Sequence, residues 1–228
     1  MTIEHTWKPV TLLLVEYPVG DHLGLALAWL SFFPIFFIIG CLSIVLLRRD
    51  LHTITFLAGI FINEGINLII KKYLKHPRPV MDPGRYKLSS YGMPSDHAQA
   101  TSFIVTYLCL FVLLRLYRNA SLLEDLWKYI LCCCLVGIGG GVAFSRVYLG
   151  YHTWSQVGCG SLLGVLAGLA WFLLVHWHLS NYFSLLANSP IGNQLLLRDC
   201  STIPNVLYFE YVHIKKESTH RQRRKGSC

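Results

Sequence analysis

Charged residues are scarce in this chain. Asp, Glu, Lys and Arg together make up 14% of its 228 residues, whereas a soluble domain carries roughly 25%. Hydrophobic residues reach 54% and gather in long runs. This composition excludes an ordinary soluble domain and indicates a membrane protein.

The sequence also lacks the spacings of metal sites and the motifs of nucleic-acid-binding proteins. Neither C-x-x-C nor H-E-x-x-H occurs, so nothing indicates a bound metal. The net charge of +8 comes from short basic clusters between apolar runs, with no nucleic-acid-binding motif beside them. We therefore interpret these clusters as partners of an anionic substrate and of anionic lipid surfaces.

A disulfide framework and a signal peptide are likewise not indicated. Six of the eight cysteines lie inside apolar runs, where cysteine behaves as a small hydrophobic residue. Cys200 and Cys228 lie outside those runs, and no feature of the sequence pairs them. The apolar run over residues 11–15 is too short for a signal-peptide core, so we expect membrane insertion to begin with the first full span.

Five apolar stretches are candidate membrane spans, and they predict an all-α, polytopic helical bundle. A helix needs roughly 20 residues to cross a bilayer. The stretches cover residues 24–47, 53–70, 98–116, 127–144 and 157–179. In the last of them Gly160, Gly164 and Gly168 recur every four positions, which predicts the close approach of a neighbouring helix.

The second stretch is the weakest span because three polar residues interrupt it, so a four-span bundle remains an alternative. Asn63, Glu64 and Asn67 share one helical face, and Lys71 extends that face by one turn. An ionisable residue inside a span is a functional hypothesis. Polar residues inside spans also join helices through hydrogen bonds, and the sequence leaves both interpretations open.

The chain divides into four segments by composition. Residues 1–23 precede the membrane domain, which we place at 24–179. Residues 180–214 hold only short, broken apolar pieces, which we expect to lie on the membrane surface or against the bundle. Residues 215–228 are basic and are expected to form a disordered tail. The sequence shows no internal repeat and no second domain.

Three polar stretches between the apolar runs carry the candidate chemistry, at residues 71–79, 94–97 and 145–156. In-line phosphoryl transfer needs one histidine to attack phosphorus, a second to protonate the leaving oxygen, and cations to neutralise the phosphate oxygens. Ser95 is a predicted helix N-cap, and the N-terminus of that helix could bind a phosphate. The stretches supply this set of groups: His97, His152, Lys71, Arg78, Arg146 and Ser95.

The distribution of Lys and Arg predicts the orientation of a five-span chain. Twelve of these residues fall on the side of the carboxy-terminal tail and eight on the side of the three polar stretches. The positive-inside rule then places the tail in the cytosol and all three stretches on the far side. If residues 53–70 did not cross, the three stretches would still share one side. The sequon Asn119-Ala120-Ser121 would be cytosolic and would carry no glycan.

The three stretches resemble the signature motifs of the type 2 phosphatidic acid phosphatase (PAP2) superfamily. The matching patterns are Lys71-x6-Arg78-Pro79, Pro94-Ser95-x-His97 and Ser145-Arg146-x5-His152, in that order. The resemblance implies that His152 forms a phosphohistidine, that His97 protonates the leaving group, and that no metal or other cofactor takes part. It also implies a set of phosphate-binding residues: Lys71, Arg78, Ser95 and Arg146.

Two positions depart from the family pattern. Asp96 stands where the family usually has Gly or Ser, and we expect its carboxylate to point away or to pair with a cation. Gln156 stands where an Asp usually orients the nucleophilic histidine; an amide can orient the imidazole but cannot stabilise its charge. This second departure leaves the strength of nucleophile activation open.

The chain resembles one branch of the family more narrowly. The residues that carry this resemblance are Gln156, Glu64-Gly65 and the runs at 203–207 and 209–211. That resemblance implies a multi-pass protein of the endoplasmic reticulum membrane with a lumenal site. Its substrate would be the polyprenyl lipid dolichyl diphosphate, cleaved to dolichyl phosphate to recycle the carrier of protein N-glycosylation. A broader phosphatase of phosphatidic acid and related monoesters, and an inactive membrane scaffold, remain alternatives.

Overall fold

The computed structural model describes residues 7–10, 15–79, 91–116, 122–203 and 206–225. A π-helical turn over Phe111–Arg115 extends α4, and a 3-10 turn over Leu179–Tyr182 precedes α7. The elements in chain order are β1 (Trp7–Val10), β2 (Val15–Pro18), α1 (His22–Leu30), α2 (Phe33–Arg48), α3 (Leu51–Leu74), α4 (Asp96–Leu110), α5 (Leu122–Tyr148), α6 (Trp154–Trp177), α7 (Phe183–Ala187), α8 (Pro190–Leu195) and α9 (Val206–Lys225).

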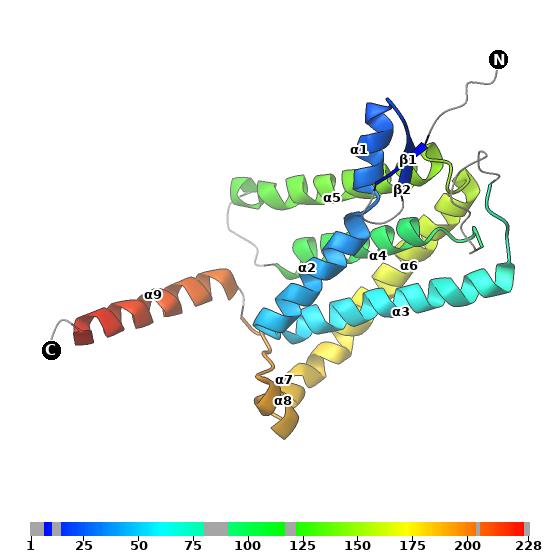
Figure 1. The fold of residues 1–228 in the computed structure, drawn as a ribbon. Coiled ribbons are helices and arrows are strands. Elements are labelled where there is room, and N and C mark those ends of the chain that lie inside the picture. The colour runs from blue at the N-terminus through cyan, green and yellow to red at the C-terminus, as the bar shows by residue number, and fades with distance from the viewer. Residues whose placement is uncertain (1–6, 11–14, 80–90, 117–121, 204–205, 226–228) are drawn as a thin grey trace, which may run out of the picture.

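Five helical segments are long and apolar enough to cross a membrane, which confirms the prediction of a polytopic helical bundle. The weak second span is a full helix of 24 residues, Leu51–Leu74, with a mean hydropathy of 1.6. In Figure 1 α4 runs through the middle of the bundle, and it contacts α3, α5 and α6. Residues on this helix are therefore placed by three neighbours at once.

The first span, predicted over residues 24–47, covers His22–Arg48 and contains a break between two helices. Its chain forms two helices, α1 and α2, which meet at Ser31 and Phe32. Pro34 lies in the first turn of α2, and because proline has no backbone N–H it cannot continue the hydrogen bonds of the preceding helix. At this break Ser31 Oγ donates to the Leu27 carbonyl at 3.0 Å and lies 2.9 Å from Ser145 Oγ of α5.

The glycines of α6 lie against α4, as the four-residue spacing predicts. A Cβ atom added at Gly160 would lie 2.7 Å from the carbonyl oxygen of Ser95, and one at Gly168 would lie 2.9 Å from that of Phe103. These distances are shorter than carbon and oxygen atoms tolerate, so only glycine permits this packing. The close approach fixes the first turn of α4 against the start of α6, where Ser95 N donates to the Gln156 carbonyl at 3.2 Å.

An aromatic core fills the bundle below that junction. Phe56 of α3 stacks on Tyr107 of α4 with ring centroids 4.4 Å apart, and Tyr107 meets Phe172 of α6 edge to face at 5.6 Å. Phe103 and Ile104 of α4 are also buried here. The core holds α3, α4 and α6 together by apolar burial and ring contacts.

The amino-terminal segment contains an element that the sequence did not predict, the antiparallel strand pair β1 and β2. Val15 of β2 and Ala28 and Phe32 of the first span form a buried cluster with Leu149 and Tyr151, which follow α5. The segment therefore packs on the part of the third polar stretch that follows α5.

The carboxy-terminal segment differs from the prediction of a disordered tail after residue 214, because α9 continues to Lys225. A Glu217–Arg221 pair one turn apart supports the helix there. An ion pair between Arg48 and Glu210 joins α9 to the end of α2, and α9 then projects away from the bundle (Figure 1). The sequon at Asn119 lies outside the described residues, so its state remains a prediction.

Candidate active site

The three polar stretches meet at one end of the bundle (Figure 1). Lys71 and Arg146 lie in the last turns of α3 and α5, and His97 lies in the first turn of α4. His152 lies two residues before α6. His97 interacts electrostatically with all the others, namely Arg146, His152, Lys71 and Arg78. The structure thus brings together the residues that the sequence singles out.

His152 is held with one ring nitrogen fixed and the other turned toward a cation. Its Nδ1 lies 2.9 Å from the Gly92 carbonyl oxygen and 3.2 Å from Gln156 Oε1. Both partners only accept hydrogen bonds, so Nδ1 carries the proton and Nε2 keeps its lone pair. Nε2 lies 3.2 Å from Arg78 Nη1. The imidazole therefore presents an unprotonated nitrogen at the position where the cations gather.

Burial keeps His152 uncharged. His152 is only 3% exposed. Its pKa is lowered to about 3, chiefly by this burial and secondly by the positive charges of Arg146 and Arg78. The hydrogen bonds to Gln156 and Gly92 oppose the shift without reversing it. An attacking histidine must be neutral, and His152 meets that condition at any physiological pH.

Gln156 connects the start of α6 to the loop that carries Arg78. Its Oε1 accepts from Thr153 N at 3.2 Å as well as from His152. Its Nε2 donates to the Pro77 carbonyl at 2.8 Å and lies 3.1 Å from His76 Nδ1. A carboxylate could not donate these bonds. The amide therefore orients His152, as an Asp at this position could, and also donates to the loop that carries Arg78, which an ionised Asp could not do.

Ser95 occupies the N-cap position of α4, as predicted, and its side chain makes no capping bond. Its backbone N–H bonds to the Gln156 carbonyl, and its backbone packs on Gly160, which fixes the residue without help from its hydroxyl. Among the described residues its buried Oγ has no hydrogen-bond partner. The hydroxyl and the N-terminus of α4 are a suitable pair of donors for an anion beside His97.

The three site cations are held in different ways. Lys71 is buried and forms an ion pair with Asp96, so Asp96 pairs with a cation as expected. The Arg146 guanidinium lies over the Tyr151 ring, 4.3 Å from its centroid. Arg78 donates from Nη1 to the Tyr151 carbonyl at 3.4 Å, and burial lowers its pKa. Cations of this number and type can neutralise the oxygens of a bound phosphate.

The sequence leaves two interpretations of the polar face of α3 open, a functional role and hydrogen bonds between helices. Asn67 Nδ2 donates to Gln99 Oε1 at 2.8 Å, and Gln99 Nε2 donates to Asn63 Oδ1 at 3.0 Å. The two asparagines thus join α3 to α4 just below the site. Glu64 is half-buried and interacts electrostatically with Asp96 and Lys71, and its participation stays a prediction.

Three contributors to the site were not predicted: the carbonyl of Gly92, the ring of Tyr151, and the Pro77 carbonyl. A backbone carbonyl carries no sequence signal, because every residue has one. Gly92 does offer an indirect one, since a Cβ atom there would lie 2.6 Å from Gln156 Nε2. A glycine close before Pro94 is thus consistent with tight packing of this loop on α6.

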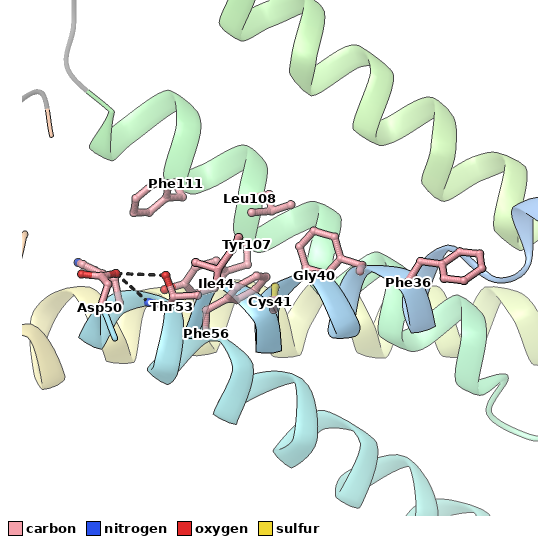
Figure 2. A pocket seen from close by; sticks show the side chains of 12 residues that line it. Phe36, Gly40, Cys41, Ile44, Asp50, Thr53, Phe56, Tyr107, Leu108 and Phe111 are labelled. Carbon is pink, nitrogen blue, oxygen red and sulfur yellow. Dashed lines mark hydrogen bonds between the residues drawn. The ribbon is translucent and has the colours of Figure 1, made fainter. Parts of the chain in front are cut away.

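An apolar cavity lies away from the site residues. Figure 2 shows a cavity of about 510 Å³ between α2, α3 and α4, lined by residues such as Phe36, Phe56 and Phe111. Its polar corner is Asp50, which caps α3 by accepting from Thr53 N at 3.1 Å. The cavity contains none of the site residues and lies toward the opposite end of α3.

Among the described residues, no three His, Cys, Asp or Glu side chains form a group that could hold a metal ion.

Comparison with known proteins shows the family of this chain. The model of the PAP2 superfamily matches residues 52–180, which include all three motifs. Dolichyldiphosphatase 1 of Homo sapiens is 44% identical over 97% of this chain and 94% of its own length. Lipid phosphate phosphatase gamma of Arabidopsis thaliana is 37% identical over 90% of this chain and 89% of its own.

A solved structure shares the fold. The PAP2-type phosphatidylglycerolphosphate phosphatase of Bacillus subtilis superimposes with a TM-score of 0.57 over 70% of this chain and 80% of its own, at 18% identity. The matched family region and the near full-length similarity at 44% identity lead to one assignment. This chain belongs to the dolichyldiphosphatase family within the PAP2 superfamily of membrane phosphatases.

Proposed function

We propose that this protein hydrolyses dolichyl diphosphate to dolichyl phosphate and inorganic phosphate. The choice of substrate rests on the relatives named dolichyldiphosphatase, the human one being similar across nearly the whole chain. The reaction would take place at the lumenal face of the endoplasmic reticulum membrane, with the prenyl chain in the bilayer. It would recycle the carrier lipid of protein N-glycosylation.

The fixed orientation of His152 is the observation that carries the mechanism. With Nδ1–H held by the Gly92 carbonyl and Gln156 Oε1, Nε2 attacks the terminal phosphorus. The bond between that phosphorus and the bridging oxygen breaks, and the departing dolichyl phosphate takes a proton from His97, which must enter this step as the imidazolium, a form that the negative charge of the bound substrate would favour. A phosphohistidine at Nε2 remains.

Water completes the reaction. His97, now neutral, takes a proton from a water molecule as that water attacks the phosphohistidine, and inorganic phosphate leaves. Four groups bind the phosphate oxygens throughout: Lys71, Arg78, Ser95 and Arg146. Arg78, which contacts Nε2 at 3.2 Å, must turn its donors to the phosphate when substrate binds. Because these residues supply the positive charge, the mechanism needs no metal ion.

The lumenal placement rests on the distribution of basic residues along the five spans. The cytosolic side would carry α9, whose Lys215, Lys216 and Arg221 are exposed, together with the end of α2. The site residues would then face the lumen. A glycan on Asn119 would contradict this orientation.

Two alternatives remain to be tested against this function. The Arabidopsis relative is named lipid phosphate phosphatase gamma, which favours a broader activity on lipid monoesters as the second candidate. An inactive scaffold would have no use for a histidine with a fixed tautomer beside buried cations, so the site argues against it.

Phosphate release by the purified protein in detergent with EDTA distinguishes these functions. Dolichyl diphosphate, dolichyl phosphate and phosphatidic acid would compete at equal surface concentration. We expect EDTA to leave the rate unchanged and the diphosphate to be preferred. Equal rates on all three would replace the narrow function with the broad one, and no turnover of any would leave the scaffold.

A further inference from the structure

The amino-terminal segment contacts the candidate site although it lies before the matched PAP2 region, which begins at residue 52. Its described elements are β1, β2 and α1. Three contacts join it to the end of α5: Glu16 N donates to Tyr151 Oη at 2.7 Å, Tyr148 Oη donates to Asp21 Oδ2 at 2.9 Å, and Ser31 Oγ contacts Ser145 Oγ at 2.9 Å. Residues on either side of Arg146 are thus bonded to this segment.

Tyr151 is the residue on which these contacts converge. It is 4% exposed and packs with Val15 of β2 and Phe32. Its hydroxyl accepts the bond from β2, its ring carries the Arg146 guanidinium, and its carbonyl accepts from Arg78 Nη1. One side chain and its backbone therefore contact both site arginines.

A ring face holds a cation differently from a carboxylate. The aromatic quadrupole attracts the guanidinium but carries no net charge, so the contact with the ring does not itself offset the charge of Arg146. The contact between Lys71 and Asp96 is of the other kind, because a carboxylate offsets the charge that it binds. The ring of Tyr151 therefore orders a long, flexible side chain without neutralising it through that contact.

We propose that Tyr151 is a positioning residue whose ring aims Arg146 at the substrate phosphate, with packing against β2 and the bond from Glu16 N as a smaller contribution to its placement. The proposal rests on the proposed function in one respect, the binding of phosphate by Arg146. It extends the functional site to a segment outside the region that defines the superfamily.

The test separates the ring from the hydroxyl and measures phosphate binding directly. Tyr151→Phe keeps the ring and removes the bond to Glu16 N, whereas Tyr151→Leu removes both. Binding of inorganic phosphate to the detergent-solubilised, full-length protein would be measured by calorimetry, together with KM and kcat. We expect Tyr151→Leu to weaken phosphate binding about 10-fold and to raise KM similarly, and Tyr151→Phe to change either by about 3-fold or less.

Leu149→Ala is the matched control for packing. Leu149 is fully buried in the same cluster, so its truncation should lower the thermal midpoint without weakening phosphate binding by the folded protein. In an Arg146→Lys background, which lacks the planar guanidinium, Tyr151→Leu should have little additional effect.

Several results would overturn the proposal. Tyr151→Leu with wild-type phosphate affinity would make Tyr151 merely structural, as would equal weakening by Leu149→Ala. Equal losses in Tyr151→Phe and Tyr151→Leu would assign the effect to the hydroxyl. Failure of the proposed function is distinguishable, because wild-type protein would then bind phosphate without hydrolysing dolichyl diphosphate.

Discussion

The two ends of the helical bundle contain different kinds of buried space. At one end, buried polar residues from four helices and two loops converge on His152. At the other end lies the open cavity of Figure 2, with an almost wholly apolar lining. A large apolar pocket is often taken as the default binding site. Here the convergence of buried cations and a neutral histidine marks the chemistry better, because phosphate demands charge rather than volume.

Buried charges serve different purposes at the two ends. Away from the site, Lys128 and Asp125 of α5 form a buried pair at 2.8 Å, one turn apart on the same helix. Within the site, the cations come from separate elements, and one of them lies on a ring. Charges paired within one helix support structure, whereas charges gathered from several elements around a nucleophile support binding.

Loss of the proposed nucleophile, at the polar end of the bundle, should have the largest effect on catalysis. We expect His152→Ala to lower kcat by about 10⁴-fold or more, because its Nε2 is the atom that attacks phosphorus in the proposed mechanism. Steady-state phosphate release in detergent measures this, with monodispersity on gel filtration as the control for folding. Activity within about 10-fold of wild type would remove His152 from the mechanism.

Removal of one site cation should have the next largest effect. Arg146→Gln keeps the length and polarity of the side chain but loses its charge and fork, so kcat/KM should fall by about 10²- to 10³-fold. The same kinetic assay measures it. A loss below about 3-fold would show that the charge gathered at this end does not serve the transition state.

The amide that replaces the family Asp should have a smaller effect. Gln156→Ala removes one of the two acceptors on His152 Nδ1 and the bond to the Pro77 carbonyl. Because the Gly92 carbonyl remains, we expect kcat to fall by about 10- to 100-fold rather than to vanish. Unchanged kinetics would leave the orientation of His152 to the Gly92 carbonyl alone.

Stability should respond to acid through His152. The pKa of His152 is about 3 in the folded protein and 6.5 in its ordinary state. Between these two pH values the unfolded chain therefore binds more protons than the folded protein. The contribution is fully present above pH 6.5 and is lost as the pH falls, by at most about 1.4 kcal/mol per unit. The thermal midpoint should therefore fall from pH 6.5 to pH 4, and less steeply in His152→Asn. Parallel curves for the two proteins would contradict this.

A change at the other end should have the smallest effect on catalysis. Lys128→Met removes the buried ion pair with Asp125 at 2.8 Å, which should destabilise the fold by about 3 kcal/mol. The kcat of the protein that remains folded should stay within about 2-fold of wild type. A large loss of kcat with normal stability would show that the two ends are coupled.

The sequence predicted the parts of this protein that depend on local pattern. Apolar runs of sufficient length predict five spans, and the glycines of α6 predict its contact with α4. The three motifs predict which side chains meet, because an even number of membrane spans separates them and places all three on one side of the membrane. These inferences need only periodicity, composition and topology.

Contacts that depend on three-dimensional placement could not be predicted. The break between α1 and α2, the strand pair, and the ring of Tyr151 under Arg146 arise where distant segments pack. The Gly92 carbonyl cannot be recognised because backbone groups leave no mark in a sequence. The continuation of α9 depends on pairs such as Glu217 with Arg221, which the composition of a basic tail conceals.

Trapping the phosphoenzyme tests the role of His152 most directly. Protein mixed with dolichyl diphosphate labelled in its terminal phosphate would be quenched within milliseconds and assayed for bound label that is lost in acid and kept in alkali. We expect such label in the wild type and none in His152→Ala. Turnover by the wild type without bound label, or label that persists in His152→Ala, would contradict attack by this histidine.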